Sequence, residues 1–148
     1  KMVNTGTIGV AAAGDSLLGV LTGIFFTDAS TSKPTFANHL DASNAATDIK
    51  GFITDDPYER FEIQSNNSGA SATTDIFNVA DIVYAAGSSP DYVSQVELND
   101  STLAAGSSAT LQILGLSKDP DNSDVGSANV NWVVRINEHQ LDMNVNGV

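Results

Sequence analysis

The chain has no cysteine, and its 148 residues include only six basic side chains against 18 acidic ones, a formal net charge of −12. Without cysteine there is no disulfide framework, no thiolate metal site and no cysteine nucleophile. A surface with this excess of negative charge repels phosphates and anionic lipid headgroups, so we expect no nucleic acid partner and no membrane partner. The shortage of cations therefore excludes general nucleic-acid binding.

Long apolar runs and charged residues are also scarce. The longest apolar run near the start, residues 8–13, is far too short to span a bilayer, which takes about 20 residues, and it lacks the pattern of a signal peptide. Charged residues make up 16% of the chain, below the roughly 25% of typical globular domains. Ser, Thr, Asn and Gly supply the polarity instead, a composition typical of strands and turns and of extracellular or virion proteins.

The most regular stretch that is present covers residues 130–136, where apolar side chains alternate with mostly polar ones. Alternation of this kind predicts a half-buried β-strand. It contains Trp132, the only tryptophan, a side chain that can bury on the order of 200 Å². Residues 110–116 form its natural partner strand, and the link between the two is rich in turn-forming residues. We predict a hairpin with a long tip, on which the rest of the domain packs.

Further short strands are predicted at intervals of about ten residues. They cover residues 17–27, 35–40, 48–54, 58–64 and 92–98. Residues 75–84 also fit a helical stripe, and there we expect a short helical turn followed by a strand. The pattern predicts an all-β, single-domain antiparallel β-sandwich or barrel, a jelly roll included, with at most one short helix.

We divide the chain into an N-terminal segment, residues 1–13, and one β domain, residues 14–148. The segment shows no clear period, so it is interpreted either as a frayed terminus or as an extended arm on a neighbouring subunit. We expect contacts with other subunits from this arm and from the end of the domain. The candidate contact residues are Met2, Val3, Ile8, Val10, Arg135, Asn137, Glu138, His139 and Gln140. His139, at a strand end, is predicted to be a surface or interface hydrogen-bonding group.

One loop has part of a metal-binding pattern. The loop of residues 119–124 puts oxygen ligands at alternate positions, as a calcium loop does at its start, and its weak candidate ligands are Asp119, Asp121 and Asp124. Asp124, however, stands where the sharp-turn glycine belongs, and Val130 stands where the bidentate glutamate belongs. A solvated turn is the better interpretation, and we predict no bound metal.

No recognised catalytic constellation is present. His39 and His139 have no Gly-x-Ser-x-Gly motif to accompany them. Asp55 and Asp56, with Glu59 and Glu62 after them, have the residue types of a general acid and base pair. Carboxylates beside a proline turn are more plausibly structural partners of the scarce arginines. We therefore predict that the chain is not an enzyme and needs no cofactor.

Three blocks of sequence carry a family resemblance. The blocks are residues 14–20 with 27–28 and 33–36, residues 49–64, and residues 111–116 with 119–122 and 134–140. Their order and spacing resemble those of capsid decoration, or cement, proteins of tailed bacteriophages, many of them marine or cyanobacterial. The similarity covers most of the chain, and none of the motifs is a catalytic signature.

The resemblance implies a virion structural protein, made in the host cytoplasm and placed on the outer surface of the capsid. Such proteins are usually homotrimers that bind the major capsid protein and stabilise the expanded head. An alternative is a receptor- or glycan-binding β module of a head fibre or tail accessory protein, which an exposed aromatic platform would favour. A secreted hydrolase-like β domain is a further alternative.

Overall fold

The structure is a computed structural model that describes residues 1–3, 6–67, 71–106, 108–122, 125–126 and 129–142. Within these residues the regular structure consists of nine strands and three single 3-10 turns. The strands are β1 (Val20–Thr27), β2 (Pro34–Ala37), β3 (Lys50–Thr54), β4 (Phe61–Gln64), β5 (Val79–Ala80), β6 (Ile82–Val83), β7 (Glu97–Leu98), β8 (Leu111–Leu116) and β9 (Asn131–Ile136). All pairs between these strands are antiparallel, which confirms the predicted all-β class.

The predicted hairpin is β8 and β9, the centre of a four-stranded sheet ordered β4-β9-β8-β5. Trp132, Val134 and Ile136 are at most 4% exposed, while the residues between them are half-buried, as the alternation predicted. The predicted helical turn before a strand is also present, because the 3-10 turn Thr73–Asp75 precedes β5 and β6.

The hydrophobic core lies between this sheet and the two-stranded sheet of β6 and β7. Its buried members are Leu17, Ala80, Ile82, Leu98, Leu111, Ile113, Val130, Trp132, Val134 and Ile136. Two sheets that bury their facing sides in this way form a small β-sandwich. We call this part of the molecule the body.

The long tip of the hairpin is fixed by Asn122, a buried residue in the 3-10 turn Pro120–Asn122. Its amide nitrogen donates to the carbonyl oxygens of Ser117 (3.2 Å) and Asn131 (2.8 Å). Its amide oxygen accepts from the backbone N–H of Asn131 at 2.8 Å. One side chain thus closes the base of the tip, beside the backbone hydrogen bond of 3.0 Å from the Ser117 N–H to the Asn131 carbonyl.

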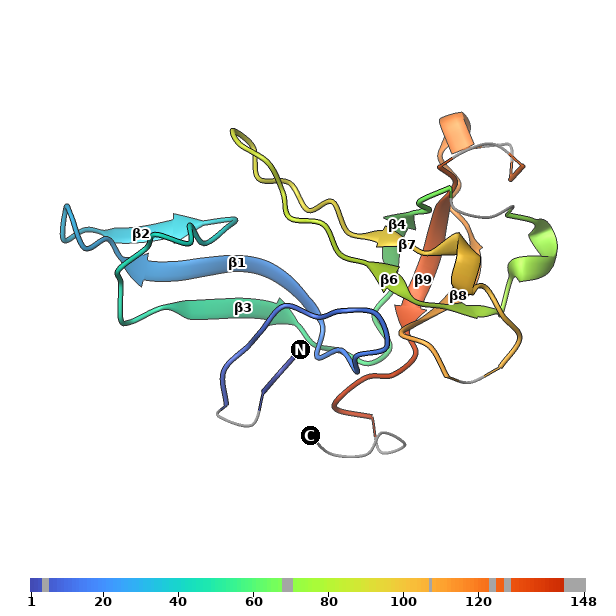
Figure 1. Ribbon diagram of the computed structural model, residues 1–148, viewed down its shortest axis with the longest axis horizontal. Helices are drawn as coiled ribbons and strands as arrows, with labels where there is room; N and C mark the ends of the chain where they lie inside the picture. The colour runs from blue at the N-terminus through green and yellow to red at the C-terminus, as the bar shows by residue number, and fades with distance from the viewer. Residues whose placement is uncertain (4–5, 68–70, 107, 123–124, 127–128, 143–148) are drawn as a thin grey trace.

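A separate three-stranded sheet, ordered β2-β1-β3, projects from one side of the body (Figure 1). None of its strands contributes a described residue to the buried core cluster. The prediction that the rest of the domain packs on the hairpin is therefore wrong for these strands. Ile24 and Phe26 are instead buried against other parts of the chain, at 3% and 6% exposure.

The N-terminal segment folds back on its own chain instead of extending away from it. Met2 bridges Ile8 in antiparallel fashion, and Lys1 and Gly9 exchange backbone hydrogen bonds of 2.9 and 2.8 Å. The return is made near Gly6, whose φ of 74° suits glycine. In this structure the expected arm is a small hairpin beside the end of the projecting sheet that is nearer to the body (Figure 1).

Candidate interaction surfaces

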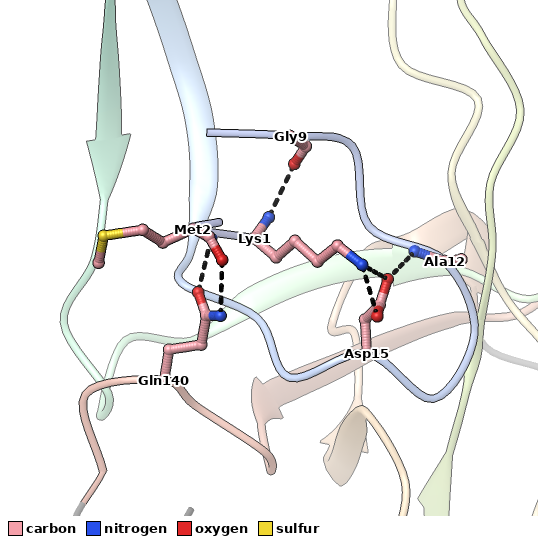
Figure 2. Close-up of polar contacts among 6 residues, drawn as sticks. All are labelled: Lys1, Met2, Gly9, Ala12, Asp15 and Gln140. Carbon is pink, nitrogen blue, oxygen red and sulfur yellow. Dashed lines mark hydrogen bonds and ion pairs between the residues drawn. The ribbon is translucent and has the colours of Figure 1, made fainter. Parts of the chain in front are cut away.

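The two segments predicted to make contacts lie together, although they are at opposite ends of the sequence (Figure 2). The backbone N–H of Met2 donates to Oε1 of Gln140 at 2.6 Å, and Nε2 of Gln140 donates to the Met2 carbonyl at 3.1 Å. Gln140 is itself fixed, because its backbone N–H donates to the Leu17 carbonyl just before β1. We call the surface of Met2, Ile8, Val10, Gln140 and Leu141 the terminal surface.

An ion pair of Lys1 also fastens the start of the N-terminal hairpin (Figure 2). Nζ of Lys1 lies 2.8 Å from both carboxylate oxygens of Asp15, and Oδ2 of Asp15 also accepts the backbone N–H of Ala12 at 2.7 Å. The hydrogen bond from Lys1 is the main cause that lowers the pKa of the Asp15 carboxyl. Lys1 is therefore held to Asp15, while Met2 next to it is held to Gln140.

The terminal surface is mostly apolar where it meets solvent. Val10 is 63% exposed, Leu141 51% and Ile8 43%. Val3 is half-buried, and its side chain lies near Gly9 within the hairpin. Exposed aliphatic side chains on two segments that hydrogen bonds join mark a surface that gains free energy on burial.

Three of the predicted contact residues are engaged within their own chain. Nε of Arg135 donates to Oε1 of its register partner Gln112 at 2.8 Å, and Nδ2 of Asn137 donates to the Ala109 carbonyl at 2.8 Å. The Glu138 carbonyl accepts the backbone N–H of Leu17 at 2.8 Å. These three residues therefore hold the end of β9, and the residues that follow it, to the rest of the body.

The prediction that His139 lies at the surface is wrong, because its side chain is only 1% exposed. His139 bridges Leu17, and its Nδ1 accepts the backbone N–H of Leu141 at 3.1 Å. Burial is the main cause that lowers the pKa of this imidazole. The buried His139 side chain therefore holds the backbone of Leu141, a residue of the terminal surface, through this hydrogen bond.

Sequence reasoning missed a second surface, on the projecting sheet. Phe25 pairs with Phe36, and Gly23 pairs with Phe52, so the three phenylalanines share one face. The Phe36 and Phe52 rings stack at 5.2 Å, and the Phe25 and Phe36 rings lie 6.3 Å apart. A Cβ atom at Gly23 would lie 2.9 Å from the Phe36 ring. Glycine at this position therefore leaves room for the Phe36 ring to stack on Phe52. We call this surface the phenylalanine face.

The candidate metal and acid–base residues accept hydrogen bonds from groups of their own chain. Oδ1 of Asp119 accepts the backbone N–H of Asp121 at 3.1 Å, and Asp124 lies outside the described residues. Asp56 accepts the backbone N–H of Tyr58, and Glu62 accepts the Ser117 hydroxyl. In the described part of the chain, no group of three or more His, Asp or Glu residues is placed to hold a metal ion.

No protein-family model, no curated protein and no solved structure matches the chain. Among the residues described, no helix has the length and apolar character needed to cross a membrane. The functional interpretation therefore depends on the two surfaces.

Proposed function

We propose that the chain is a virion structural protein, a cement protein that binds the outer face of the major capsid protein and stabilises the expanded phage head. The observation that carries this proposal is the reciprocal pair of hydrogen bonds between Met2 and Gln140. It joins the two segments expected to make contacts into one apolar surface. The resemblance in the order of sequence blocks gives independent support.

The physical requirements of a cement protein agree with this arrangement. Such a protein needs a rigid body and an adhesive surface that holds a neighbour in place. Fully burying one aliphatic side chain such as Val10 contributes about 1.5–3 kcal/mol. A single contact of this strength is weak. When linked copies bind repeated sites on a shell, avidity raises the overall affinity.

A single substitution in the terminal surface tests the proposal. Val10→Asp places a charge where an apolar contact is expected, and we expect at least a tenfold loss of affinity, about 1.4 kcal/mol or more. Binding is measured by co-sedimentation with expanded heads of the virus whose genome encodes the chain. Val93→Asp is the matched control, because Val93 is 67% exposed against 63% for Val10 and lies outside the terminal surface.

Deletion of residues 1–10 is a second variant for the same experiment. We expect it to weaken shell binding and to leave the body folded, since Met2, Ile8 and Val10 are not members of the core cluster. The fluorescence of Trp132, which is fully buried in the body, reports on folding. Full occupancy of heads by both variants would refute the proposed role of the terminal surface.

A receptor- or glycan-binding module is the second candidate, favoured by the exposed aromatic rings of the phenylalanine face. Sugar sites combine an aromatic platform with several polar groups that fix orientation. The three strands that carry this face contain one charged side chain, Lys50, so they offer few charged groups to orient a sugar. A glycan array probed with the wild type and with Phe36→Ala separates the two: ligand binding lost in the variant would favour the module.

A further inference from the structure

We infer that the phenylalanine face is covered by other copies of this same chain. Phe36 is 65% exposed and Phe52 46%, and their stacked rings are continuous with Phe25. Contiguous exposed aromatic surface on a soluble chain marks an interaction site. This inference goes beyond shell binding, because it concerns the chain in the absence of any head.

Only one side of the projecting sheet presents this apolar surface. On the opposite side Ile24 and Phe26 are buried, and the Ile8 side chain lies over Gly51. The aromatic side is packed within the single chain, since the Phe36 ring occupies the space above Gly23. A surface that needs no rearrangement loses little conformational entropy on docking.

The distribution of charge favours contact between copies through this face. Residues 17–54, which contain this sheet, hold three aspartates and two lysines, a net charge of −1. The remaining residues therefore carry −11 of the total −12. Two copies repel each other strongly through their bodies, but the sheet projects away from the body (Figure 1) and is nearly neutral. Self-association through this face therefore meets less repulsion than contact between the acidic bodies.

The size of the face sets the strength of the association. β1 is eight residues long, so strand rise and spacing give a face of about 27 Å by 14 Å. This is smaller than the ~800 Å² per partner of a standard stable interface. We expect a reversible, concentration-dependent oligomer. Two copies pack face to face, and three copies enclose the rings about a threefold axis, which would agree with the expected trimer.

Sedimentation equilibrium of the purified full chain over a range of concentrations tests the inference. We expect a mass of two or three times 15.4 kDa that increases with added salt, because salt screens the repulsion between bodies. Phe36→Asp should raise the dissociation constant roughly thirtyfold, as loss of a central aromatic contact does. Phe77→Asp is the matched control, since Phe77 is 69% exposed outside the projecting sheet, and it should associate like the wild type.

Cross-linking gives a second measurement that does not disturb the rings. The chain has no cysteine, so Lys50→Cys introduces a single thiol on the same face as its register partner Phe25. A short bis-maleimide should link copies of this variant, but not copies of Tyr58→Cys, whose site is also exposed. A monomer at every concentration, or equal association of Phe36→Asp and Phe77→Asp, would overturn the inference whatever the outcome of the head-binding experiment.

Discussion

At the scale of single residues, His139 couples folding to pH. Burial lowers the pKa of its imidazole below 6.5, while Asp55, Asp56 and Asp142 raise it by a smaller amount. Below pH 6.5 the unfolded chain binds a proton that the folded chain does not, so the free energy of unfolding falls until the folded pKa is reached. We expect urea midpoints, followed by Trp132 fluorescence, to decrease between pH 7 and pH 5.5, above the range where most carboxylates titrate.

His139→Asn is the variant that isolates this effect. Its side chain keeps an acceptor but has no titrating group, so the midpoint should change less over this pH range. His39→Asn, at the other histidine, should retain the pH dependence of the wild type. If His139→Asn and the wild type lose the same stability on acidification, the cause lies elsewhere.

Trp132 and His139 show which residue positions the sequence can predict. Trp132 stands on the apolar side of an alternating strand, and this local period predicts a side chain that is buried, either in the core or at a subunit interface; the structure places it in the core. His139 is buried because it bridges Leu17, a residue more than a hundred positions earlier. No local pattern records a contact of that range, and a polar side chain after a strand is ordinarily exposed.

At the scale of elements, Asn122 controls the hairpin tip. Asn122→Ala removes three hydrogen bonds and leaves the Asn131 N–H and the Ser117 carbonyl without this partner. An unpaired buried group costs about 1–3 kcal/mol, and we expect destabilisation of about 2 kcal/mol. Urea unfolding measures it.

Asp121→Ala is the control within the same turn. Asp121 is exposed, and its backbone N–H, not its side chain, makes the bond to Asp119. We expect its unfolding free energy to stay within ~0.5 kcal/mol of the wild type, as for most surface substitutions. Equal losses in both variants would show that the turn, and not the Asn122 side chain, is what matters.

The strands were predictable to different degrees. β1, β3, β4, β8 and β9 fall within ranges that apolar pattern and turn residues predict. Of residues 92–98, however, only Glu97 and Leu98 pair, opposite Val83 and Ile82. Alternation predicts that a segment can be a strand, but whether it becomes one depends on a neighbour with free backbone groups.

At the scale of the whole molecule, stability should divide between the body and the projecting sheet. The body holds the core cluster, whereas the strands of the sheet contribute nothing to it among the described residues. We expect amides of Ile113 and Val134 to exchange with solvent only through global unfolding, and those of β1 and β3 to exchange at least tenfold faster. Hydrogen exchange at low protein concentration measures this. Equal protection in both parts would show that they unfold as one unit.

The division of the molecule into a body and a projecting sheet could not be predicted from the sequence. Each strand of both sheets has its own apolar pattern, and a pattern does not say which strands share a core. The aromatic rings of β1, β2 and β3 were visible as residues, yet their convergence depends on strand register, which Gly23 and the bulge in β1 help to set. The terminal surface likewise required the Met2–Gln140 contact to bring two separately predicted segments together.

The turn between β1 and β2 has a consequence for engineering. Asp28 and Lys33 close it with a backbone hydrogen bond of 2.9 Å, and residues 29–33 are exposed at the end of the projecting sheet away from the body (Figure 1). Extra residues in a closed surface loop cost little, because loop entropy grows only slowly with length. A peptide epitope inserted between Ser30 and Thr31 would therefore be displayed clear of both the body and the terminal surface, and a decorated particle would present it in many copies.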